Sequence, residues 1–120
     1  MTTDETMRTA IRTRRYIKLR YSEGTASTFI VEPYALFYDP SNRLTLYGFI
    51  WASAPVAYAK GCRGFLVDRI ASIEVLDSDY GRPQPGYFSE DWTQVRVVCG
   101  LYYPMRATLR SGDAAPAAGR

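Results

Sequence analysis

Residues 63–70, Arg-Gly-Phe-Leu-Val-Asp-Arg-Ile, combine a strand-like apolar pattern with two arginines and an aspartate. At the period of two that strands follow, Arg63, Phe65, Val67 and Arg69 share one face. A guanidinium group presents a planar fork of donors that matches a phosphate or a carboxylate. The pattern therefore predicts an anion-binding pair. The alternative is a solvated strand face, because charged residues are mostly exposed.

A second basic group lies between residues 8 and 20, where no acid occurs, although the net charge of the chain is only +3. Such a run favours contact with phosphates or with an acidic partner. A solvated helix face is the alternative interpretation. The nucleic-acid-binding residues predicted from this group are Arg8, Arg12, Arg15 and Lys18.

The chain contains no histidine and only two cysteines, Cys62 and Cys99. This excludes histidine-assisted nucleophiles, imidazole acid–base catalysis and the usual zinc sites. Asp68, Asp77 and Asp79 carry the oxygen ligands that a magnesium site needs, but acids are common beside turns for other reasons. We predict no enzyme activity, no metal and no cofactor.

The length of 120 residues and a hydrophobic content of 47% indicate one globular domain. Asp4 and Glu5 precede any apolar run, so nothing at the start is typical of a signal peptide. The uncharged run 44–59 is shorter than the ~20 apolar residues that span a bilayer. We predict a cytoplasmic protein that does not associate with a membrane.

The elements that must position these side chains are one helix and a series of short strands. Thr2 and Glu5 have capping-box spacing, and a helix to about Arg14 would place Arg8, Arg12 and Arg15 together. Alternating or β-branched runs predict strands, and Pro33 inside one of them predicts an edge, a bend or a bulge. The predicted strands are 17–21, 28–38, 43–51, 62–67 and 71–76, with a turn at 39–42.

The predicted fold class is mainly β: a short N-terminal helix followed by a five-stranded antiparallel barrel over about residues 15–77. The helix and barrel form a unit over residues 1–80. Residues 81–110 are predicted to be a C-terminal extension with packed strands at 95–98 and 105–109. Residues 111–120 are small and polar and predict a disordered tail.

The order of motifs from about Ala10 to Tyr80 resembles the WYL domain, a bacterial regulatory module. The matching segments are Ile17-x-x-x-Tyr21, Glu32-Pro33-Tyr34-Ala35-Leu36, residues 42–48 and the arginine-containing segment 63–70. The resemblance implies an Sm-like, SH3-type barrel that senses a ligand through a basic groove. In the family it also implies roles in transcriptional control or phage defence, with single-stranded nucleic acid as one ligand class.

Several residues depart from the family pattern. Leu44-Thr45-Leu46 replaces the namesake Trp-Tyr-Leu triplet, and Phe29 and Leu66 stand where the family has arginines. The basic groove is thereby reduced to Arg63 and Arg69, with Arg43 as a further candidate.

We predict a non-catalytic regulatory module that binds single-stranded nucleic acid or a nucleotide-like anionic ligand. The ligand-binding residues are Arg63, Arg69, Tyr47 and Arg43, with Tyr47 as a stacking face for a base. The alternative is a protein–protein adaptor or homodimer that has lost the ligand site. Its surface would include the run around Trp51 and residues 101–103.

Overall fold

The computed structural model describes residues 2–23, 25–55, 58–84 and 95–101. These residues form a mainly β structure with one short N-terminal α-helix, which confirms the mainly β composition and the helix of the predicted fold class. The elements are α1 (Thr3–Thr13), β1 (Arg15–Glu23), β2 (Thr25–Tyr38), β3 (Leu44–Ala54), β4 (Gly61–Leu66), the 3₁₀ helix η1 (Val67–Arg69), β5 (Ile70–Asp79) and β6 (Arg96–Gly100).

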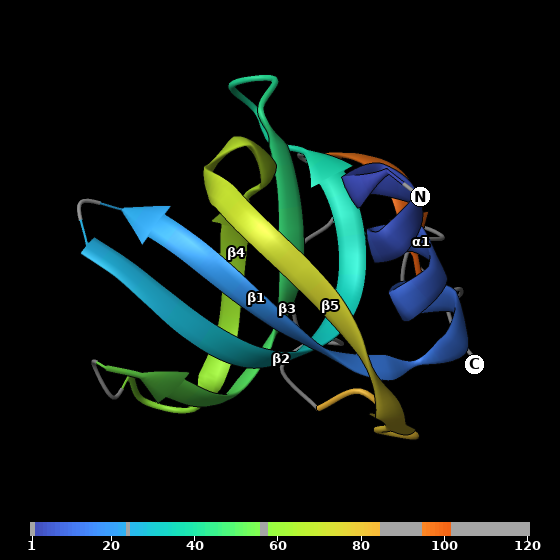
Figure 1. Cartoon of the computed structure of the whole chain (residues 1–120). Helices are drawn as coiled ribbons and strands as arrows, with labels where there is room; N and C mark the ends of the chain where they lie inside the picture. Colours follow the sequence, from blue (N-terminus) through green and yellow to red (C-terminus); the bar gives the residue numbers. More distant parts are fainter. Residues whose placement is uncertain (1, 24, 56–57, 85–94, 102–120) are drawn as a thin grey trace.

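The strands form one antiparallel sheet in the order β4-β3-β2-β1-β5, with β6 paired to β2. The sheet is strongly curled, and α1 lies at one end while the β1–β2 hairpin projects at the other (Figure 1). The hydroxyl of Tyr21 in β1 accepts a 3.0 Å hydrogen bond from the backbone N–H of Leu66 at the end of β4. Two strands separate β1 from β4 in the sheet order, so this contact bridges the curl. Among the described residues no ladder joins β4 to β5, which η1 connects instead.

Helix α1 begins with the predicted capping box between Thr2 and Glu5. It ends at Arg14, whose left-handed conformation (φ 54°) lets its N–H donate to the carbonyls of Ala10 and Ile11. This turn sends Arg15 into β1. The predicted row of Arg8, Arg12 and Arg15 on one helix face is therefore wrong, because the helix stops before Arg15.

Strand β2 changes neighbours at Pro33. Its pairing with β1 ends at Val31, and its pairing with β6 begins at Ala35. Proline has no N–H to donate to a neighbouring strand. Because β2 changes neighbours at this point, the missing backbone hydrogen bond costs little even though β2 is a central strand. The register with β3 also shifts between Pro33 and Ala35, so of the edge, bend or bulge that Pro33 predicts, the structure shows a bulge-like irregularity inside a central strand. The carbonyls of Pro33 and Tyr34 accept hydrogen bonds from the Tyr80 hydroxyl and the Leu101 N–H.

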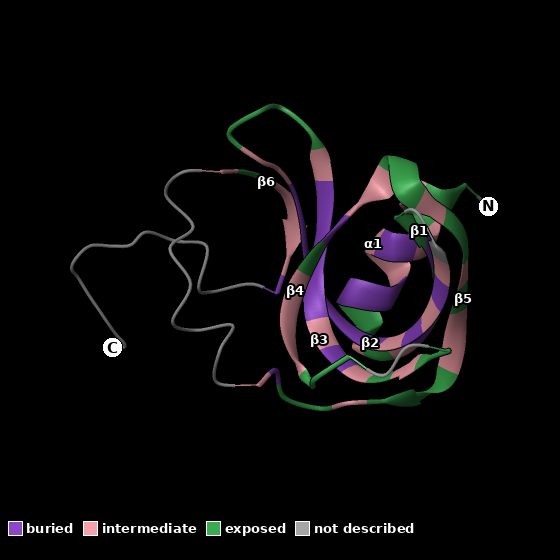
Figure 2. Ribbon diagram, turned by 90° about the vertical axis from the view of Figure 1, so that its left-hand side faces the viewer, coloured by how far each residue is buried: buried purple, intermediate pink, exposed green. Residues whose placement is uncertain are grey.

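The core lies inside the curl of the sheet, where the buried parts of β1, β2 and β3 face α1 (Figure 2). Alternation explains β1, because Ile17, Leu19 and Tyr21 are buried whereas Lys18 and Arg20 are exposed. The helix contributes Met7, Ala10 and Ile11. Between β2 and β3, Asp39 closes the predicted turn by accepting from the N–H groups of residues 41 and 43.

The strand boundaries differ from the predicted ones in two places that affect the site. The fourth strand ends at Leu66, because Val67–Arg69 form η1. The third strand, β3, continues to Ala54, three residues beyond its predicted end at residue 51. Strand β6 occupies 96–100, near the strand predicted at 95–98. The strand predicted at 105–109 and the tail at 111–120 lie outside the described residues. No helix in the described ranges has the length and apolar character needed to cross a membrane.

Candidate anion-binding site

The side chain of Arg63 in β4 packs against four aromatic rings. Its guanidinium carbon lies 5.0 Å from the ring centre of Phe65, 5.4 Å from Tyr21, and 5.5 Å from both Phe29 and Tyr58. Rings at such distances attract a cation and also restrict its side chain. Only 25% of the Arg63 side chain is exposed. The guanidinium group is therefore held in one place while one side of it still meets solvent.

Glu23, at the end of β1, brings the two predicted arginines together. Arg63 Nη2 donates to Glu23 Oε1 at 2.8 Å, and Arg69 Nη1 lies 4.0 Å from Glu23 Oε2. The predicted alternation of Arg63 and Arg69 along one strand is wrong, because Arg69 belongs to η1. The pair converges through the 3₁₀ turn and the curl of the sheet rather than through strand periodicity.

Arg43, the third predicted ligand-binding arginine, precedes β3 and lies 4.0 Å from Asp68, measured between Nη2 and Oδ1. Both side chains are largely exposed, so this ion pair is weak. Asp68 lies next to Arg69 in the chain. Arg43 therefore lies beside η1, at the edge of the candidate site rather than in its centre.

Two tyrosines differ in what they offer a ligand. Tyr47, the predicted stacking residue, is 7% exposed and packs with its ring centre 6.5 Å from that of Tyr34. Tyr58 is 43% exposed, and its ring lies 5.3 Å from Phe29 and beside Arg63. Tyr58 was not among the predicted site residues, and it lies between the strands predicted at 43–51 and 62–67. A lone tyrosine five residues before Arg63, in a loop without other aromatic residues, was the available signal.

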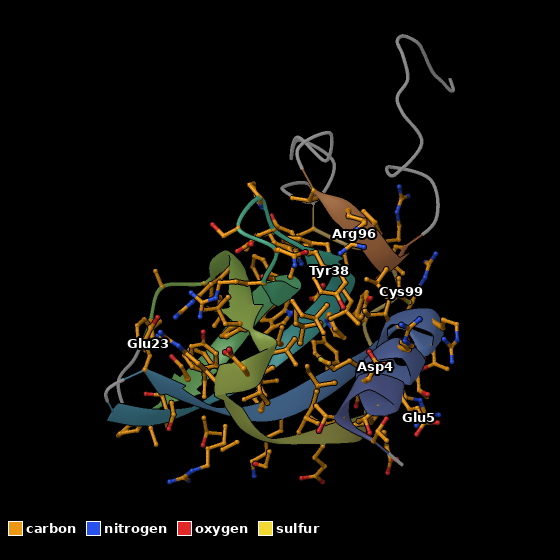
Figure 3. All side chains as sticks on the ribbon, turned by 90° about the horizontal axis from the view of Figure 1, so that it is seen from above. Asp4, Glu5, Glu23, Tyr38, Arg96 and Cys99 are labelled. Atoms are coloured by element: carbon orange, nitrogen blue, oxygen red, sulfur yellow. The ribbon has the colours of Figure 1, made fainter. Side chains whose placement is uncertain are left out.

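The predicted nucleic-acid-binding residues near the start of the chain lie elsewhere. Arg8 pairs with Asp4 at 2.7 Å, Arg15 lies 3.7 Å from Asp77, and Arg12 and Lys18 are exposed. Figure 3 shows Glu23 at one side of the molecule and Asp4, the partner of Arg8, at the other. The structure thus divides the predicted basic residues between two separate surfaces.

A second polar cluster, which the sequence analysis did not identify, surrounds the buried carboxylate of Glu32. This side chain is 1% exposed and accepts hydrogen bonds from the Tyr34 hydroxyl and from Nε1 of Trp51. The Tyr34 hydroxyl accepts in turn from the N–H of Gln84 at 2.7 Å. Burial, followed by the hydrogen bond to Glu32, raises the pKa of Tyr34 above its usual range. The cluster attaches the chain after β5 to β2 and is structural.

Two of the three aspartates with possible magnesium ligands, Asp68 and Asp77, do not lie together. Asp68 pairs with Arg43 and Asp77 with Arg15, at different places on the sheet. Within the described ranges no three histidine, cysteine, aspartate or glutamate residues are grouped as metal ligands would be.

Fold and site together define a small β-rich domain with an arginine pair at one end of a curled sheet. The family model of the WYL domain matches residues 3–75, more than half of the chain, and the protein belongs to the WYL domain family. WYL domains are in general regulatory, ligand-sensing and non-enzymatic modules. Searches among curated proteins and among solved structures found no match.

Proposed function

We propose that this chain is a regulatory module that binds single-stranded nucleic acid, or a nucleotide-like anionic ligand, at Arg63 and Arg69. The observation that carries the proposal is the convergence of both arginines on one carboxylate, with the Arg63 guanidinium group held among aromatic rings. Two donors that already meet one anionic group need little rearrangement to meet a phosphate. Within this proposal the sheet is an Sm-like, SH3-type barrel, and the setting is transcriptional control or phage defence in the cytoplasm.

Each residue has a separate role in this proposal. Arg63 contacts a phosphate through its exposed side, and Arg69 supplies a second positive charge from η1. Tyr58 takes the stacking role, because its ring is exposed next to Arg63 whereas Tyr47 is buried. Stacking of one base on an exposed aromatic ring contributes ~1–3 kcal/mol. Arg43 lies at the edge of the site beside η1, and the buried Tyr47 contributes through packing.

The test is fluorescence anisotropy with labelled single-stranded oligothymidylate and oligouridylate at several salt concentrations. Each phosphate that the protein neutralises adds about 0.7 to the slope of log affinity against log salt. Arg63→Met keeps an apolar chain among the rings but removes the charge, so we expect weaker binding and a slope reduced by about 0.7. Tyr58→Ala should weaken binding about tenfold, within the range of one stacked base, and leave the slope unchanged.

Matched controls are Arg12→Gln and Tyr38→Phe, which alter a basic and an aromatic side chain remote from Glu23. Circular dichroism verifies that each variant is folded. Binding that is absent at low salt, or that is unchanged in the Arg63→Met/Arg69→Gln double variant, would rule out the proposed ligand class.

The alternative function is a protein–protein adaptor, and one observation favours it. Strand β5 pairs with β1 along one edge, and none of the described strands covers its other edge. Such an edge can accept a strand from another chain. A homodimer in solution would support the adaptor function. Capture of a protein partner would support it as well, if binding persists in Arg63→Met and is lost in Ser72→Pro of β5.

A further inference from the structure

Glu23 occupies the position that an anionic ligand of the arginine pair would take. Its Oε1 accepts from Arg63 at 2.8 Å, and its Oε2 lies 4.0 Å from Arg69. Each carboxylate oxygen therefore faces a different arginine. A phosphate group uses the same arrangement of two oxygens toward two guanidinium groups.

The two sides of this contact are held very differently. Arg63 is fixed by four aromatic rings and is 25% exposed, whereas the side chain of Glu23 is 50% exposed. Glu23 also stands at the end of β1, opposite Thr25 in the hairpin. An ion pair with one half-exposed partner gains little in free energy. The carboxylate can therefore leave while the guanidinium group stays in place.

The residue at position 29 strengthens this difference. The ring of Phe29 lies 5.5 Å from the guanidinium carbon of Arg63, so this residue is one of the apolar groups that hold the guanidinium in place. With two arginines and one glutamate, the charge of Glu23 cancels half of the local positive charge.

We infer that Glu23 is a built-in competitor for the arginine pair, and that an anionic ligand binds by displacing its carboxylate. This inference rests on the proposed function and concerns the regulation of the same site. A competing carboxylate lowers the affinity for every anion that displaces it by the same factor, which is set by the strength of its own ion pair.

The test compares Glu23→Gln with Glu74→Gln in the anisotropy assay with labelled oligothymidylate. Both substitutions remove one negative charge, but Glu74 is an exposed residue of β5 that lies opposite Lys18. We expect Glu23→Gln to tighten binding about threefold to fivefold, the equivalent of an exposed ion pair. Glu74→Gln should change affinity less than twofold. In an Arg63→Met background, Glu23→Gln should have no more effect than Glu74→Gln.

A second arm uses inorganic pyrophosphate and citrate as unlabelled competitors. Because the cost of displacing Glu23 is the same for both competitors, Glu23→Gln should tighten the inhibition constants of pyrophosphate and citrate by a similar factor. Glu23→Ala repeats the test with a side chain that makes no hydrogen bond to Arg63. Thermal unfolding verifies that the variants are folded.

The outcomes separate the two proposals. Binding that depends on Arg63 but is unchanged or weakened by Glu23→Gln overturns the competitor role and leaves the proposed function standing. Weakened binding would instead mean that Glu23 positions Arg63 or accepts a hydrogen bond from the ligand. Absence of binding by the wild type and by Glu23→Gln alike removes the proposed function, and the competitor role with it.

Discussion

At the residue scale, Glu32 shows how much one buried carboxylate can organise. Its two oxygens accept from the Tyr34 hydroxyl and from Trp51, and Tyr34 in turn accepts from Gln84. These partners come from β2, from β3 and from the segment after β5. A buried carboxyl group needs hydrogen-bond donors, and each oxygen of Glu32 accepts from one. The run around Trp51, which suggested a partner surface, is partly occupied by this contact.

Glu32→Ala should be strongly destabilising. It leaves the hydroxyl of Tyr34 and the N–H of Trp51 without their carboxylate acceptor, and we expect a loss of about 3 kcal/mol in the free energy of unfolding. Urea denaturation measures this loss. Glu74→Ala on the exposed side of β5 is the matched control and should stay within about 0.5 kcal/mol of the wild type. Equal stability of the two variants would show that the cluster contributes nothing.

The buried tyrosines predict loss of stability at alkaline pH. Burial raises the pKa of Tyr34 and of Tyr80 above the usual range, and the charge of Glu32 acts in the same direction. A raised pKa means that the folded state holds protons that the unfolded state releases. The stabilising contribution is therefore complete below the unfolded-state pKa of about 10 and is lost as the pH rises above it.

The free energy of unfolding, measured in urea from neutral pH to above pH 10, should fall more steeply in the wild type than in Tyr34→Phe. Slopes rather than absolute values are compared, because Tyr34→Phe also loses hydrogen bonds. Tyr58→Phe, which alters an exposed ring, should retain the wild-type slope. If the free energy of unfolding falls with pH equally steeply in the wild type and in Tyr34→Phe, the buried hydroxyl of Tyr34 is not the cause of the alkaline loss of stability.

At the element scale, the irregularity of β2 decides where its neighbours can lie. Gly48 of β3 lies opposite Pro33 at the bulge. A Cβ atom added to Gly48 would lie 2.3 Å from the carbonyl oxygen of Glu32 and 2.6 Å from Cγ1 of Val31. The first of these is backbone and cannot rotate away. The two strands can approach this closely only because residue 48 has no side chain.

Gly48→Ala should therefore destabilise the protein by about 1–3 kcal/mol, as overpacking commonly does. Gly61→Ala in β4 is the control, because a Cβ atom there meets nothing within 4 Å. We expect Gly61→Ala to change the free energy of unfolding by less than about 0.5 kcal/mol or to raise it slightly. Thermal and urea unfolding of the two variants test this, and a harmless Gly48→Ala would mean that β3 can move away from β2.

At the scale of the whole molecule, the curl of the sheet separates two basic surfaces. The β1–β2 hairpin with Glu23 lies at one end of the molecule and α1 lies at the other (Figures 1 and 3). A ligand centred on Arg63 would have to extend across the molecule to reach the helix. The helix arginines are therefore a separate surface and not a continuation of the site.

Arg12→Gln should leave the affinity for a short oligonucleotide within about twofold of the wild type, because charges separated by more than the Debye length of about 10 Å are screened. The same variant should reduce the affinity of a long oligonucleotide only if that strand also contacts α1. Anisotropy titrations with both lengths provide the measurement. A large effect of Arg12→Gln on the short oligonucleotide would place the binding surface on the helix.

The sequence by itself determined the local structure. Capping-box spacing predicted the start of α1, alternation predicted the strands, and Pro33 predicted an irregularity in its strand. Each of these patterns depends on neighbouring residues alone. The motif order from residue 10 to 80 indicated the family, which the match over 3–75 shows. The sequence also singled out Arg63 and Arg69 as a pair, although by the wrong geometry.

Only the tertiary structure decided how the site is assembled. Glu23 is 40 residues from Arg63 in the chain, and no periodicity relates them. Their contact depends on how far the sheet curls and on η1 turning Arg69 back toward β1. The burial of Tyr47 and the exposure of Tyr58 depend on packing between distant strands in the same way. Sheet curvature and side-chain burial result from many contacts between residues that are distant in the chain. They therefore cannot be predicted from the spacing of residues along it.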